Sequence, residues 1–290
     1  MRITELIESL VVGESDHLVL DGNNGTRKIT FEKLAEAFNK KFGWMSLWGD
    51  NLPVGQRRNT WRGKNLGSVV TEKQWDEIGN GTFKDLFLGD YWEIDGHKWR
   101  IVDFNYWYGF GDSGQNIYTY HLVIMPDRLL YLHSMNDTDT TEGGYVGSKM
   151  YKTGLNEAKN IINNAFGASH VLKHREYLVN TVTNGKPSSG SWYDSTVELP
   201  NEFMIYGSHI HSIQQDSSTI PFRLTIDNVQ LAGLKAIHSL ILSERYSFWL
   251  RDILITGYFS RVNGDGACGF SYASRINGVR PVFGICKSNS

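Results

Sequence analysis

Apolar residues in the first 43 positions recur with helical spacing on both sides of a glycine-rich turn. Residues 18–20 and 27–31 flank the turn at 22–25, which predicts a β-hairpin. Thr30 can cap the second helix and Gly43 can end it. The two helical stripes consist of Ile3, Leu6, Ile7 and Leu10, and of Phe31, Leu34, Ala35, Phe38 and Phe42. A helix-hairpin-helix module this small cannot bury both stripes, so it is expected to dock on a partner.

The next part of the chain changes from irregular to strand-like patterns. Residues 44–62 show neither the two-residue period of a strand nor the 3.6-residue period of a helix, so residues 44–79 are expected to form a structured connector. Within it, Thr71 and Gln74 form a capping box for a short helix through Ile78. Strands are then predicted at 91–94, 99–104 and 118–125, with Asp95-Gly96 as a hairpin turn between the first two.

Two amphipathic helices and a β-rich end complete the pattern. Helices are predicted over 155–166, closed by Gly167, and over 231–241, with Asp227 as N-cap. The chain between them is expected to be loop-rich, as at residues 185–190. The last predicted strands cover 248–252, 257–262, 270–273 and 279–285. The fold class expected is therefore α+β, mainly β.

Composition and charge exclude several classes of partner. The chain has 30 Gly and 9 Trp, which favours turn-rich β structure with aromatic packing. The net charge is −2, from 29 basic and 31 acidic residues mixed along the chain, so nucleic acid is not an expected partner. No apolar run approaches the ~18 residues that span a membrane. We expect a protein made in the cytoplasm, in which Cys268 and Cys286 are reduced, buried thiols rather than a disulfide.

Several separated motifs occur in an order that resembles a known family. The motifs are Gly89-Asp90-Tyr91-Trp92, Trp99-Arg100-Ile101, Met125-Pro126-Asp127, Met135-Asn136 with Thr138, Thr140 and Thr141, Gly143-Gly144-Tyr145, Gly147-Ser148-Lys149-Met150, Phe166-Gly167, His170, Glu176, Trp249-Leu250-Arg251-Asp252, Phe259, Gly266 and Gly278-Val279-Arg280-Pro281-Val282-Phe283. With these motifs, residues 80–285 resemble a virion protein family of phages and prophages of Gram-positive and gut bacteria. Asp139 departs from the family pattern, where Asn is expected.

Two parts of the chain carry further resemblances. The closing run, from Trp249-Leu250-Arg251 to Gly278-Val279-Arg280-Pro281, is similar to the end of C-type-lectin-like domains, including phage target-binding proteins and the formylglycine-generating-enzyme fold. Residues 16–34 resemble the segments that attach phage fibre and baseplate proteins to the particle.

The resemblance implies a virion structural protein, located on a fibre, the head or the baseplate tip, that binds a host surface glycan or protein. Residues 1–43 would attach it to other virion proteins, and residues 80–290 would form a β-rich domain whose C-terminal half is lectin-like, with two packed helices. A homo-oligomer, with a trimer favoured, follows from the same comparison. The first alternative is a purely structural decoration protein, and the second is a polysaccharide-degrading virion enzyme.

Two groups of residues are candidates for ligand binding. In a lectin-like fold the hairpin after the Trp-Leu-Arg strand lies at the binding face, and Tyr, Asn and Arg suit recognition. A solvated hairpin is the alternative. A second group, Tyr106, Trp107 and Tyr108 with Phe110, is suited either to stacking on sugars or to core packing. The hairpin candidates are Tyr258, Arg261, Asn263, Asp265, Phe270, Tyr272 and Arg275.

Other candidates are structural or metal-binding. Trp249, Arg251, Arg280 and Phe283 are expected to form the frame of the C-terminal half, with Arg251 or Arg280 paired to a buried acid such as Asp252.

Asp137, Asp139 and Glu142, with Asn136, offer oxygen ligands for calcium, although the spacing is not that of an EF-hand. The histidine pairs 170/174 and 209/211 lack a third zinc ligand at motif spacing. No nucleophile elbow, phosphate loop, dinucleotide fingerprint or zincin helix is present, so we expect no enzyme and no cofactor other than calcium.

Overall fold

The computed structural model describes residues 17–20, 27–30, 33–34, 57–112, 114–212 and 229–289. The chain divides into two compact units, Met1–Leu52 and Pro53–Ser290. Among the described residues, no helix is both long and apolar enough to cross a membrane.

The first unit contains the predicted hairpin. Strand β1 (His17–Leu20) pairs antiparallel with β2 (Arg27–Thr30), with His17 opposite Thr30. The hydroxyl of Thr30 accepts a hydrogen bond from the Lys33 backbone N–H at 3.3 Å, which fits the predicted cap. The two flanking helices fall almost wholly outside the described residues, so the helix-hairpin-helix module stays a prediction.

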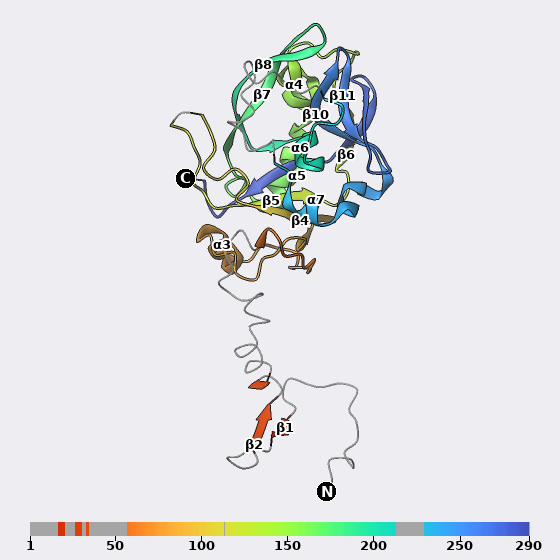
Figure 1. Ribbon diagram of the computed structural model, residues 1–290. Helices are drawn as coiled ribbons and strands as arrows, with labels where there is room; N and C mark the ends of the chain where they lie inside the picture. Colours follow the sequence, from red (N-terminus) through yellow and green to blue (C-terminus); the bar gives the residue numbers. More distant parts are fainter. Residues whose placement is uncertain are drawn as a thin grey trace. The chain divides into compact units, whose positions relative to one another are not determined.

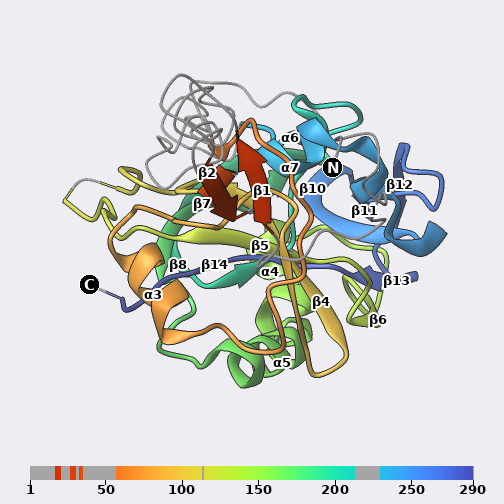
Figure 2. The same cartoon turned by 90° about the horizontal axis from the view of Figure 1, so that it is seen from below.

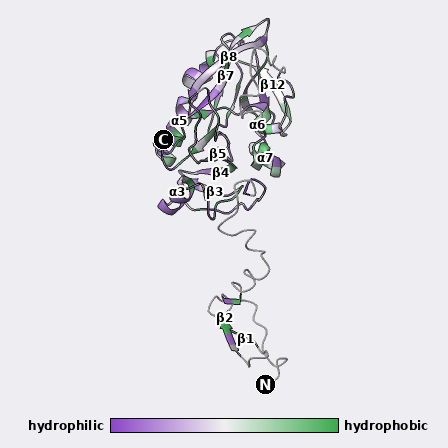
Figure 3. Ribbon diagram, turned by 60° about the vertical axis from the view of Figure 1, so that its left-hand side comes forward, coloured by the Kyte–Doolittle hydropathy of each residue, from purple (hydrophilic) through white to green (hydrophobic). Residues whose placement is uncertain are grey.

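The second unit begins with an irregular segment and helix α3 (Glu72–Gly79) (Figure 1). The capping box is present as predicted: the Thr71 side chain accepts from the Gln74 N–H, and the Gln74 side chain accepts from the Thr71 N–H. Trp75 and Ile78 are buried, whereas the rest of α3 is mainly hydrophilic, as its colour in Figure 3 shows.

One five-stranded sheet has the order β3-β4-β5-β14-β9. Its β3–β4 hairpin turns at Asp95 and Gly96, both with positive φ (51° and 78°), which fits the predicted Asp-Gly turn. Figure 2 shows β14 passing beside β5, as their antiparallel pairing requires. The strands are β3 (Tyr91–Ile94), β4 (His97–Phe104), β5 (Leu122–Pro126), β9 (Val197–Glu198) and β14 (Val282–Ile285).

The other five-stranded sheet has the order β12-β11-β10-β13-β6. The strand predicted over 279–285 is divided between the two sheets, because β13 ends at Val279 and β14 begins after Pro281. Proline lacks the N–H that would continue a ladder, so the chain changes sheets there. The strands are β6 (Tyr131–Ser134), β10 (Phe248–Ile255), β11 (Tyr258–Val262), β12 (Cys268–Tyr272) and β13 (Ile276–Val279).

A long hairpin replaces part of the loop-rich region expected between the helices. Strands β7 (His174–Thr183) and β8 (Lys186–Ser195) pair antiparallel and lie side by side in Figure 1. They are joined by Asn184 and Gly185, with φ of 51° and 76°. Asn-Gly is the preferred sequence of such a two-residue turn, so the loop prediction was wrong at a recognisable motif.

The predicted helix over 155–166 is confirmed, whereas the one over 231–241 is broken. Helix α5 (Asn156–Phe166) ends at Gly167, whose φ is 84°. The second prediction becomes a short helix α7 (Ala232–Ala236), an extended Ile237 (φ −133°, ψ 95°) and a 3-10 helix η4 (His238–Arg245). The two packed long helices are therefore not observed. The remaining helices are α4 (Gly144–Gly147), the π-helical turn η2 (Met150–Gly154) and α6 (Glu202–Tyr206).

Two predicted frame residues lie fully buried in the main core. Phe283 packs against Trp99 and Phe166 with ring centroids 5.7 Å away in each case. Trp249 contacts the same core and donates from Nε1 to the His133 carbonyl at 2.8 Å. Their neighbours in sequence, such as Phe248 and Val282, belong to a second core, because successive strand residues face opposite sides of a sheet.

We predict that Phe283→Ala and Trp249→Ala each lower the free energy of unfolding by roughly 3 to 5 kcal/mol, because each leaves a cavity in a packed core. Denaturant unfolding of the full chain measures this. The control is Ile276→Ala, because Ile276 is 69% exposed and its truncation should change stability by less than about 0.5 kcal/mol. Equal losses for all three variants would contradict the assignment of the frame.

Candidate ligand-binding surface

Three predicted ligand residues form an exposed aromatic cluster on the β11–β12 hairpin. Tyr258 lies opposite Tyr272, and Phe270 lies opposite Ser260, so all three side chains point to one face of the hairpin. The Tyr258 ring is 4.1 Å from that of Tyr272 and 5.7 Å from that of Phe270. Phe270 and Tyr272 remain 46% and 43% exposed. We call these three residues the aromatic trio.

The same alternation places the predicted arginines elsewhere. Arg261 and Ser271 point to the opposite face of the hairpin from the aromatic trio. The Arg261 guanidinium donates to the side-chain oxygens of Asn263 and Asn277, both at 3.0 Å. Arg261 and Arg275 line a shallow hollow of about 580 Å³ with Ser271, Ser274 and Ile276. The predicted set is therefore divided between two faces.

Asn263 and Asp265 shape the turn that joins β11 to β12. The Asn263 N–H donates to the Ala267 carbonyl at 2.8 Å, and the Asp265 carboxylate accepts from the Ala267 N–H at 3.0 Å. Both residues stabilise the local turn, which is the ordinary role of Asn and Asp at such positions.

A buried carboxylate, which sequence patterns did not single out, holds this hairpin in place. Glu202 at the start of α6 accepts hydrogen bonds from the Ser260 hydroxyl of β11 at 2.6 Å and from the Ser212 hydroxyl at 2.8 Å. It also accepts the backbone N–H groups of Ile210, at 2.6 Å, and of Ser212. Burial raises the pKa of Glu202, but these hydrogen bonds outweigh it and lower the pKa below its ordinary value. We call this set the Glu202 network.

The Glu202 network connects directly to the aromatic trio. It fixes the segment that carries His211, whose ring lies edge-on to Phe270 at 5.4 Å. The His211 Nε2 also lies 3.1 Å from the Cys268 carbonyl of β12. The hairpin is therefore anchored on the side that bears the trio.

The second predicted aromatic group is mostly core. Tyr106 and Trp107 are buried, and the Tyr106 hydroxyl donates to the Val229 carbonyl at 2.7 Å. Their burial fits the core-packing alternative and leaves neither ring available to stack on a ligand. Tyr108 lies nearer the surface, stacked on Tyr120 at 5.2 Å and edge-on to Tyr118 at 5.6 Å.

Arg251 pairs with a buried acid, as predicted, and that acid is Glu176 of β7; Asp252 was the example that the sequence offered. Arg251 and Glu176 are both buried and form an ion pair. The other Glu176 oxygen accepts from the Trp107 Nε1–H and the His174 Nε2–H, both at 3.0 Å. Burial raises the pKa of Glu176, but Arg251 and His174 outweigh it and bring the pKa to about 2. We call these four residues the Glu176 network.

A second buried glutamate lies nearby. Glu198 accepts from the Tyr145 and Ser195 hydroxyls, each at 2.8 Å. Burial and the neighbouring Glu176 charge raise the pKa of Glu198, and burial raises that of Tyr145. Both carboxylates are enclosed and hydrogen-bonded, which is the arrangement of structural polar groups rather than of a pair flanking a substrate cleft.

Arg280 acts on the backbone. Its guanidinium donates to the carbonyls of Pro126 and Leu240, each at 2.8 Å, and lies over the Phe248 ring. Burial lowers its pKa to about 10. Arg280 therefore joins the frame, as predicted, but through carbonyl groups instead of a buried acid.

Two of the predicted calcium ligands, Asp137 and Asp139, have other partners. Asp137 pairs with Lys149, and Asp139 accepts from the Ser274 N–H at 3.1 Å. In the described part of the chain, no group of three or more His, Cys, Asp or Glu side chains is placed to hold a metal ion. The loop at Asp137–Glu142 therefore gives the calcium prediction no support.

The two cysteines are free thiols, with Cys286 buried and Cys268 half-buried. Burial raises the pKa of the Cys286 thiol to about 12.

No family model, curated protein or solved structure matches this chain. The function proposed below therefore relies on the sequence motifs and on the geometry of the second unit.

We predict that Glu176→Gln destabilises the fold by about 3 to 5 kcal/mol at pH 7, because it removes the negative charge that pairs with the buried Arg251 guanidinium. The pKa of Glu176 is lowered to about 2, so its stabilising contribution is present above its unfolded pKa and is lost as pH falls through the folded pKa. The difference between variant and unaltered protein should therefore shrink between pH 5 and pH 2, about the interval between these two pKa values. Urea unfolding across this range measures it, and a difference that does not change with pH would contradict the ion-pair assignment.

Proposed function

We propose that this protein is a bacteriophage virion component that binds a host surface glycan or protein, without catalysis, through the aromatic trio. The observation that carries the proposal is an aromatic cluster on an anchored hairpin, in which the Tyr258 ring contacts the exposed rings of both Phe270 and Tyr272. The motif resemblance supplies the virion context. It also supplies the finer fold proposal, in which residues 80–290 end in a C-type-lectin-like half.

The trio has the chemistry of a recognition surface. Tyrosine and phenylalanine offer large contact area while losing little conformational freedom, and tyrosine hydroxyls add adaptable hydrogen bonds. The Glu202 network holds β11 and the His211 segment, so little conformational freedom remains to be lost when a ligand binds. A glycan ring stacked on Phe270 and Tyr272 would use both properties.

A purely structural role has its own supporting observation. Leu132 of β6 and Ile276 of β13 are 60% and 69% exposed. Register places both on the same face of neighbouring strands, since Ile276 pairs with Ser134 and Leu132 with Gly278. Exposed apolar neighbours of this kind are typical of a protein interface, which would suit contact with another virion protein or another copy of the chain.

The remaining elements of the proposal concern assembly. Residues 1–43 are proposed to attach the protein to the particle, and the chain is proposed to form a homo-oligomer, with a trimer favoured. In this proposal the protein is made in the host cytoplasm and functions on the virion.

We predict that Phe270→Ala and Tyr272→Ala each weaken attachment to host cells by more than ~1 kcal/mol while changing stability by less than about 0.5 kcal/mol. Attachment of purified protein and thermal melting are measured together. The matched control is Tyr246→Ala, because Tyr246 is 62% exposed outside the hairpin. Variants that attach normally would move the ligand surface elsewhere, and variants that melt early would show a packed hairpin.

We predict that a chain lacking residues 1–43 folds but does not join the particle, because the omitted module carries the unburied apolar stripes. Thermal melting tests folding, and quantification of the protein in purified virions tests incorporation. Incorporation at the normal level would contradict the attachment role.

A further inference from the structure

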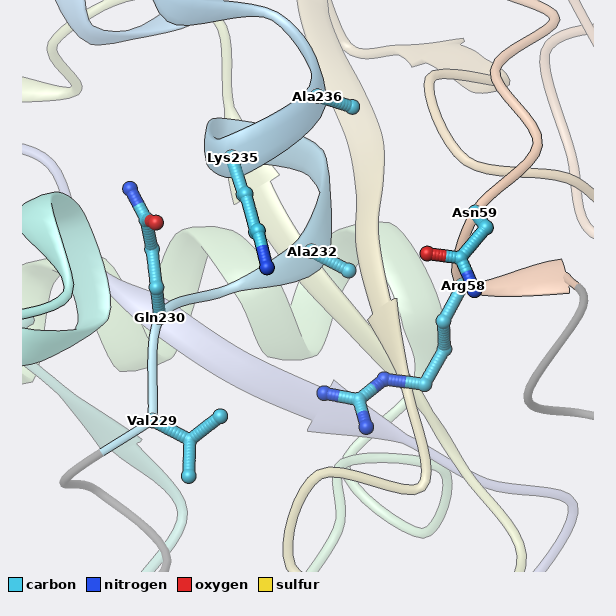
Figure 4. A pocket seen from close by; sticks show the side chains of 7 residues that line it. All are labelled: Arg58, Asn59, Val229, Gln230, Ala232, Lys235 and Ala236. Carbon is cyan, nitrogen blue, oxygen red and sulfur yellow. The ribbon is translucent and has the colours of Figure 1, made fainter.

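A second surface, lined by cationic and amide side chains, lies between α7 and the irregular segment at the start of the second unit. It is a hollow of about 490 Å³. Figure 4 shows the side chains of Arg58 and Lys235 reaching toward the same space from these two elements. Asn59 and Gln230 add amide groups at its edge, and Val229 and Ala232 provide an apolar wall.

Arg58 is held in a fixed orientation. Its Nε and Nη2 donate to the two carboxylate oxygens of Asp103 at 2.6 and 2.9 Å. The Asp103 side chain is fully buried and also accepts the Ala232 N–H at 3.1 Å. Among the described residues, the Arg58 Nη1 has no hydrogen-bond acceptor. The guanidinium is therefore positioned before any ligand arrives, which reduces the entropic cost of binding.

Lys235 supplies a positive charge that the described residues do not offset. Its side chain is exposed, and within the described ranges it forms no ion pair and no hydrogen bond. None of the described residues that line the hollow is Asp or Glu. Since Asp103 offsets Arg58, the described lining of the hollow carries an excess of one positive charge, with donors from two cationic side chains.

We propose that this hollow binds the oxyanion, a phosphate or carboxylate group, of a small organic ligand. The free N–H groups of Arg58 and the ammonium of Lys235 donate to the anionic oxygens, and Val229 and Ala232 contact the organic part. The site is separate in composition from the aromatic trio, so it does not depend on the function proposed for that trio.

The experiment titrates the full chain with inorganic phosphate at constant ionic strength and follows binding by calorimetry or by chemical shifts. Lys235→Gln is expected to weaken phosphate binding about tenfold, because it removes one charge-assisted donor. The matched control is Lys152→Gln, which makes the same change at an exposed position on η2 and should leave the affinity unchanged. Equal affinities for the two variants, or no saturable binding to the unaltered protein, would overturn the proposal.

Further variants and probes separate the parts of the proposal. Arg58→Lys keeps the charge at Asp103 but loses the fixed two-point geometry, so it should weaken phosphate binding in a chain whose melting shows that it is folded. Acetate compared with phosphate identifies the preferred oxyanion. Glycerol 3-phosphate should bind more tightly than inorganic phosphate if the apolar wall takes part. Equal affinities would show that Val229 and Ala232 do not contribute to binding.

Discussion

Arg251 and Glu176 meet in the interior of the second unit, where either charge alone would destabilise the fold by several kcal/mol. Their pairing places β10, at the centre of one sheet, against β7, which is separated from it by 75 positions in the chain. Trp107 and His174 satisfy the second oxygen of Glu176, so the aromatic loop after β4 is tied to the same carboxylate. One buried negative charge therefore fixes how three separate segments pack.

Glu202 is a second buried carboxylate that holds separate segments together. It connects α6, residues 210–212 and β11 through hydrogen bonds that its two carboxylate oxygens accept. The aromatic trio lies on the outer part of that construction. Its exposure is compatible with a single conformation because the polar contacts beneath it, and not its own burial, determine where the hairpin lies.

Local patterns predicted the elements that depend on local chemistry. The residues that determine such an element lie within a few positions of one another in the sequence. Examples are the Thr71–Gln74 capping box, the Asp95-Gly96 turn and the apolar stripe of α5. The patterns failed where an element or contact depends on residues that are distant in the sequence. The break at Ile237 divides a regular helical stripe, and β7 and β8 lack a simple apolar alternation. The partner of Arg251 could not be chosen among 31 acidic residues from sequence alone.

Residue types indicated which hairpin carries the ligand surface, and the strand register decided which of its side chains share a face. The sequence placed tyrosines, a phenylalanine and arginines on one hairpin, but the pairing of Tyr258 with Tyr272 sends Arg261 and Ser271 to the opposite face. A ligand on the aromatic trio therefore meets rings, tyrosine hydroxyls and the edge of His211, and not a guanidinium from Arg261. Such a surface favours the neutral, C–H-rich face of a sugar over a charged group, whereas the cationic side chains of the hollow at Arg58 and Lys235 favour an anion.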